Sequence, residues 1–171
     1  MNRKGFTLIE LLIVIAVIGI LAGVFFIGVT GFRNSALDAR RVADLKNVQN
    51  SLELYYSKCR LYPNNTVSGS NCPTASGGST SPADYAALVT ILQDAQIGIT
   101  AVPRDPVNDT TYYYDYISDG TNYILSALLT GDRDVLRDQA AVPGSQTIGG
   151  RSISCYDASA SIYRYCVSGN R

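Results

Sequence analysis

The chain has 171 residues, which suits one modest globular domain plus an appendage, and its formal net charge is zero. A neutral chain has no basic field that would attract nucleic acid. The sequence contains no His, the commonest general base and metal ligand, so we expect neither an enzyme nor a protein with a metal or cofactor.

The N-terminal segment is apolar and is preceded by cations. Residues 11–32 carry no charge, and a bilayer span needs about 20 apolar residues. Arg3 and Lys4 precede the run, so the positive-inside rule places the N-terminus in the cytoplasm. The alternative is a secretory signal peptide, but the run is longer than the usual apolar core and no small-residue cleavage site follows. We therefore predict a transmembrane helix over 6–32.

Glu10 interrupts the start of this apolar run. A carboxylate is costly inside a spanning helix, by about 2.5–3.5 kcal/mol near the centre and less near the interface, so it usually has a function. Lys4-Gly5-Phe6-Thr7-Leu8-Ile9-Glu10 resembles the class III signal of type IV pilins and type II secretion pseudopilins.

The resemblance implies processing at this motif. In the family a prepilin peptidase cuts after the glycine and the new N-terminal residue is methylated, which here gives a leader of residues 1–5, a cut after Gly5 and a methylated Phe6. Gly5 has no side chain, so a protease can approach its backbone closely. The carboxylate of Glu10 would then lie one helical turn from the Phe6 amine. In a stack of such helices it can pair with the amine of another subunit, which sets their register.

Residues 33–56 continue the helix with an amphipathic pattern. Apolar residues recur mostly at intervals of three or four, which is helical spacing, and polar residues occupy the remaining positions. The apolar set is Leu37, Val42, Leu45, Val48, Leu52 and Tyr55 or Tyr56, and the polar set is Arg40, Arg41, Asp44, Lys46, Asn47 and Glu53. A helix from Thr7 to Tyr56 would be about 75 Å long.

Residues 57–171 are predicted to form an exported globular domain. A short helix begins at Ser81-Pro82, and 112–117 with 122–129 read as a hairpin around a turn at Asp119-Gly120. Residues 151–156 and 162–167 read as a second pair of strands. The expected class is α+β, a long helix packed on a small antiparallel sheet, which resembles the pilin fold.

Four Cys in an exported domain favour two disulfides. Cys155 and Cys166 resemble the disulfide-closed C-terminal loop of many pilins, and of the three possible pairings we choose Cys59–Cys72 with Cys155–Cys166. Asp132, Asp134 and Asp138 follow a strand near where major pseudopilins bind calcium, but Arg133 and Arg137 among them favour a solvated loop. Tyr112-Tyr113-Tyr114 with Tyr116 favours a half-buried sheet over a base-stacking surface.

The expected function is that of a structural subunit of a type IV pilus or a type II secretion pseudopilus, and the sequence does not separate the two. Its partners would be other pilin-like subunits, the prepilin peptidase and an inner-membrane assembly platform. Its location would be the bacterial inner membrane, then the filament. The alternative is a membrane-tethered minor pilin or binding module that contacts a surface, DNA or a ligand.

Overall fold

The computed structural model describes residues 6–63, 72, 82–131, 144–148, 151–155 and 163–170, without the side chains of 24–30, 82–84 and 170. In these ranges the chain forms two helices and five strands: α1 (Leu8–Cys59), α2 (Pro82–Asp94), β1 (Tyr114–Ser118), β2 (Asn122–Leu128), β3 (Ser145–Ile148), β4 (Arg151–Ser154) and β5 (Arg164–Asn170). This is the α+β class that the sequence predicts, a long N-terminal helix packed on an antiparallel sheet.

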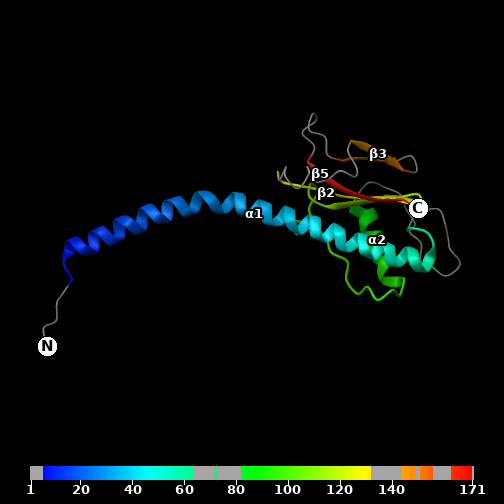
Figure 1. Cartoon of the computed structure of the whole chain (residues 1–171), viewed down its shortest axis with the longest axis horizontal. Helices are drawn as coiled ribbons and strands as arrows, with labels where there is room; N and C mark the ends of the chain where they lie inside the picture. The colour runs from blue at the N-terminus through cyan, green and yellow to red at the C-terminus, as the bar shows by residue number, and fades with distance from the viewer. Residues whose placement is uncertain are drawn as a thin grey trace.

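Helix α1 is one continuous element of 52 residues, about 78 Å at 1.5 Å per residue. Its first half extends away from the rest of the molecule and its second half lies against the sheet (Figure 1). The predicted apolar stripe is the buried face, because Leu45, Val48, Leu52 and Tyr55 have no exposed surface. The helix ends three residues later than predicted, where Arg60 adopts a left-handed conformation with φ 59° and donates its N–H to Tyr56 O.

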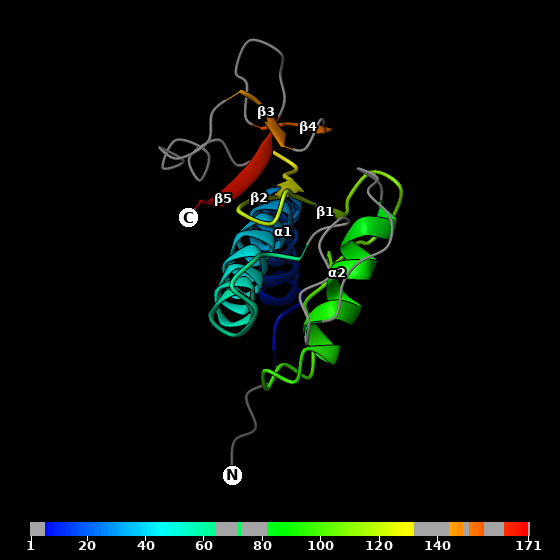
Figure 2. The ribbon, with the colours of Figure 1, turned by 90° about the vertical axis from the view of Figure 1, so that its right-hand side faces the viewer.

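The main sheet has the order β1-β2-β5 and is antiparallel throughout. Helices α1 and α2 cover the same face of it, with α1 under β2 and β5 and α2 beside β1 (Figure 2). The main core lies between these two layers, and Lys58 Nζ joins the ends of the helices by donating to Ala95 O at 2.6 Å. The second half of α1 is thus held against the sheet and beside the end of α2.

The hairpin of β3 and β4 covers part of the opposite face. A second, smaller core forms there from Ile117, Ile124, Ile153 and the disulfide of Cys155 with Cys166. Strands β1 and β2 are therefore buried on both faces along most of their length.

Two details of the predicted strands are wrong. The turn of the β1–β2 hairpin lies one position later than expected, because Asp119 N–H donates to Asn122 O and leaves Gly120 and Thr121 as the central residues. Gly120 has φ 96°, a conformation that favours glycine. The two C-terminal strands do not pair with each other: β4 pairs with β3, which the sequence did not indicate, and β5 pairs with β2.

The short helix begins at Pro82 as predicted, whereas its expected cap, Ser81, lies outside the described residues. Leu88, Ile91 and Leu92 point into the main core. Two Tyr hydroxyls of the core have backbone partners in other segments: Tyr85 donates to Pro103 O, and Tyr116 donates to Pro63 O at 2.9 Å. The all-Tyr aromatic content of the domain is therefore compatible with a dense core.

Candidate functional site: the N-terminal helix and its exit from the domain

The start of α1 is closed by a reciprocal hydrogen-bonded cap. Thr7 N–H donates to Glu10 Oε2 at 2.8 Å, and Glu10 N–H donates to Thr7 Oγ1 at 3.4 Å. The Thr7 hydroxyl also donates to Glu10 Oε2 at 2.7 Å. This capping box satisfies N–H groups that a helix start leaves without intrahelical partners. Glu10, predicted as an assembly residue, therefore also fixes where the helix begins.

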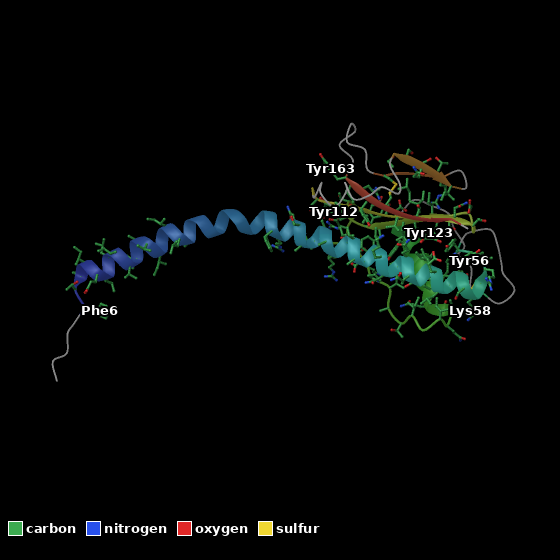
Figure 3. The ribbon with its side chains drawn as sticks, in the orientation of Figure 1. Phe6, Tyr56, Lys58, Tyr112, Tyr123 and Tyr163 are labelled. Atoms are coloured by element: carbon green, nitrogen blue, oxygen red, sulfur yellow. A yellow bond between two sulfur atoms is a disulfide. The ribbon has the colours of Figure 1, made fainter. Side chains whose placement is uncertain are left out.

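The cap leaves one carboxylate oxygen for another partner. All of the bonds between Thr7 and the Glu10 side chain use Oε2, and a carboxylate has a second acceptor in Oε1. Phe6 directly precedes the cap and lies at the end of α1 farthest from the domain (Figure 3). Gly5, predicted as the residue before the cleaved bond, lies outside the described residues.

The first half of α1 presents large apolar side chains that are at least half exposed. Burying one such side chain stabilises by about 1.5–3 kcal/mol, so a surface made only of them needs a nonaqueous environment or a partner. The exposed fractions lie between 50% and 91% for Phe6, Leu8, Ile9, Leu11, Leu12, Ile13, Val14, Ile15, Val17, Ile18, Ile20, Leu21 and Phe32.

Among the residues that the structure describes, no helix is both long enough and apolar enough to cross a bilayer. The span predicted at 6–32 includes residues 24–30, whose side chains lie outside the described ones.

A buried ionic cluster lies where α1 enters the domain. The Arg41 guanidinium donates to both carboxylate oxygens of Asp105, from Nε to Oδ2 at 2.7 Å and from Nη2 to Oδ1 at 3.2 Å. Its Nη1 donates to Asp38 Oδ1 at 2.8 Å. The side chains of Arg41, Asp38 and Asp105 are at most 1% exposed, and the guanidinium lies 4.5 Å from the centre of the Tyr112 ring.

Backbone groups from two loops complete the cluster. Asp38 accepts N–H bonds from Thr130 and Gly131, and Asp105 accepts N–H bonds from Val107 and Asn108. Burial lowers the pKa of Arg41, but the hydrogen bonds and charges of Asp105 and Asp38 outweigh it and raise that pKa above its ordinary value. The cluster thus joins α1 to the α2–β1 loop and to the residues that follow β2.

Sequence reasoning missed this cluster, because it assigned Arg41 to the solvent-facing side of α1. The structure corrects that: Arg41 is buried, whereas its neighbour Arg40 is 64% exposed on its side chain and lies 3.8 Å from Asp44. The available signal was the spacing of Asp38 and Arg41, three residues apart on one helical face, together with the Asp105-Pro106 step after α2.

The remaining predicted residues fall into three groups. Disulfides join Cys59 to Cys72 and Cys155 to Cys166, the pairing chosen from the sequence. Tyr114 and Tyr116 are buried and Tyr112 and Tyr113 half-buried, so these side chains form the edge of the core and not an open stacking surface. The candidate calcium ligands Asp132, Asp134 and Asp138 lie outside the described residues.

Comparison with known proteins gives a family model and two relatives. Residues 1–26 match the prokaryotic N-terminal methylation motif. The chain is 33% identical over 62 residues to the type II secretion system core protein G of Escherichia coli (strain K12), a match that covers 36% of this chain and 43% of that protein. The protein of the same name from Aeromonas hydrophila is 32% identical over 62 residues, with the same coverage.

The chain thus spans less than half the length of the curated relatives it matches. No solved structure matches it.

Proposed function

We propose that this chain, which its methylation motif and its similarity to core protein G assign to the type IV pilin and pseudopilin family, is a structural filament subunit. It is made as a precursor, cut after Gly5 by a prepilin peptidase and methylated on Phe6. The helix of residues 6–32 holds it in the inner membrane with its N-terminus in the cytoplasm. An assembly platform in that membrane then adds it to a growing polymer of pilin-like subunits.

One observation carries this proposal: about half of a 52-residue helix extends away from the domain, exposes large apolar side chains along its described length and carries a carboxylate in its first turn. A helix that is apolar all round belongs in lipid or in the core of an assembly. The relatives are named as core proteins of a type II secretion system, which supports a subunit of an assembly over an enzyme.

Chemically, the arrangement supports a transfer of α1 from lipid into a bundle of like helices. Apolar side chains have a similar free energy against neighbouring helices and against lipid. The charge at Glu10 therefore decides the axial position of α1 in the bundle. Glu10 Oε2 stays with its own Thr7, and Oε1 accepts from the Phe6 amine of an adjacent subunit. An unpaired carboxylate in this setting is costly, so subunits out of register are disfavoured.

The processing step is tested by intact mass. The wild-type chain, purified from membranes or filaments, should begin at Phe6 and carry one extra methyl group. Gly5→Leu should keep its full-length mass, because a bulky side chain blocks access to the bond that is cut. Asn2→Leu adds similar bulk within the leader but away from that bond, and should be processed normally. A mature N-terminus near Gly23 or beyond would contradict the proposal.

A further inference from the structure

The Arg41 cluster occupies the last point at which the domain holds α1. Residues 31–36 are exposed on the helix, and Asp38 is the first buried side chain that follows them. Residues 6–23 are exposed as well, and this part of α1 extends away from the domain (Figure 1). The side chains that fix the helix here determine the direction in which the apolar half leaves.

The distance from this point to the start of the helix makes small angular errors large. Glu10 precedes Asp38 by 28 residues, which is about 42 Å along an α-helix. A rotation of about 5° at Asp38 displaces Glu10 by about 4 Å over that length. Charge-assisted hydrogen bonds need their heavy atoms within about 3 Å, so pairing at Glu10 depends on a fixed exit direction.

The chemistry of the cluster suits fixing a direction better than adding stability. One guanidinium faces two carboxylates, so the buried group carries a net negative charge, offset by the four backbone N–H groups of Thr130, Gly131, Val107 and Asn108. Buried ion pairs often add no net stability over apolar replacements. The planar fork of arginine, however, bonds both oxygens of Asp105 at once and so holds a defined orientation.

We propose that Arg41, held between Asp38 and Asp105, is a positioning residue for filament assembly: it fixes the direction in which α1 leaves the domain. This inference rests on the proposed function, because it assigns Arg41 a role in presenting Phe6 and Glu10 to neighbouring subunits. Arg40, one residue earlier, is 64% exposed on its side chain and pairs with Asp44, whose side chain is 13% exposed, and it has no such role.

The test compares two charge-neutralising variants of the full chain, one in the Arg41 cluster and one in the Arg40–Asp44 pair. Asp38→Asn/Arg41→Met/Asp105→Asn removes all three charges and keeps amide oxygens for the backbone donors. Arg40→Met/Asp44→Asn is the matched control, in which the amide can still accept from the Tyr114 hydroxyl. Spin labels on unnatural amino acids at Asn34, before the cluster, and at Thr90 on α2 leave both disulfides intact. Pulsed electron paramagnetic resonance in detergent then gives the distance distribution between them.

The triple variant should fold cooperatively with both disulfides formed, yet give a broader or shifted distance distribution and a several-fold lower filament yield. The control should match the wild type in both. If the cluster only adds stability, the triple variant would have a lower unfolding temperature but the same distance distribution in the folded chain as the wild type. An unchanged distribution, whatever the yield, or an altered distribution with a normal yield, overturns the positioning role.

If the triple variant does not fold, Arg41→Lys is tested in its place, because it keeps the charge and loses only the planar guanidinium that bonds two oxygens at once. It should alter the distance distribution and lower the yield in a folded domain, and it overturns the proposal if both stay at wild-type values. A wild-type chain that never polymerises would instead overturn the proposed function. The distance distributions of the variants would then still decide whether Arg41 sets the direction of the helix.

Discussion

Gly169 is the residue at which the tyrosine core leaves no room for a side chain. It lies opposite Tyr123 in the β2–β5 ladder, and a Cβ added to it would collide with the Tyr123 ring. That ring is fully buried and packs edge-on against Tyr62, with 4.6 Å between ring centres. The ring therefore cannot move aside without disturbing the core beneath β2.

Gly169→Ala should destabilise the domain by about 1–3 kcal/mol, the usual cost of overpacking a well-filled core. Thermal unfolding of the full chain measures this as a fall of several degrees in the midpoint. Ser168→Ala is the control, because Ser168 is the exposed neighbour on the same strand. Equal unfolding midpoints for the two variants would contradict this prediction and would mean that the Tyr123 ring can shift to accommodate the added methyl group.

At the residue scale the sequence predicts the carboxylate at the start of α1 but not the buried Arg41 cluster where α1 leaves the domain. Glu10 stands alone in an apolar run, so its position is visible from local sequence. Arg40 and Arg41 are adjacent and chemically identical, and only the fold shows that the second one is buried. Its main partner, Asp105, lies 64 residues away, beyond the reach of any local pattern.

At the scale of elements, local signals are sufficient where an element is long or closed by a short turn. The 3.6-residue period predicts the buried stripe of α1, and two adjacent runs around Gly120 predict the β1–β2 hairpin. The pairing of β5 with β2 spans about 40 residues of sequence and depends on the three-dimensional arrangement. The strand β3, Ser-Gln-Thr-Ile, is short and polar and carries too little pattern to be recognised.

The disulfide of Cys155 with Cys166 joins the β3–β4 hairpin to the main sheet. It closes a loop with a sequence separation of 11 residues, and the chain-entropy model gives about 3 kcal/mol for such a loop. Cys155→Ala/Cys166→Ala should therefore lower the free energy of unfolding by about that amount in a denaturant titration. The second core of Ile117, Ile124 and Ile153 should be the first part to lose protection in hydrogen exchange.

Processing should not change in the Cys155→Ala/Cys166→Ala variant, because the peptidase reads only the N-terminus. Cys59→Ala/Cys72→Ala, which opens a loop of similar size whose two cysteines pack against the main core, is the comparison. Wild-type stability in the Cys155→Ala/Cys166→Ala variant, or protection lost evenly across both cores, would contradict the assignment of this disulfide to the hairpin.

At the scale of the whole molecule, one part of the chain buries its apolar side chains within itself and another part leaves them exposed. The second half of α1, α2 and the sheet bury their apolar side chains against one another. The first half of α1 exposes its apolar side chains along its described length, and the cap formed by Thr7 and Glu10 lies at its start. The division could be predicted from the sequence, because all four Phe lie in the first 32 residues and all twelve Tyr lie from Tyr55 onward.

The central claim is that Glu10 directs assembly by pairing with the Phe6 amine of a neighbouring subunit. The most direct measurement is the yield of sheared filaments against subunit retained in the membrane, for wild type, Glu10→Val and Glu10→Gln. Both variants should insert and be cleaved, yet accumulate in the membrane without filaments. Gln keeps an oxygen for the Thr7 cap, so its failure isolates the loss of charge. Normal filaments from Glu10→Gln and Glu10→Val would contradict the account.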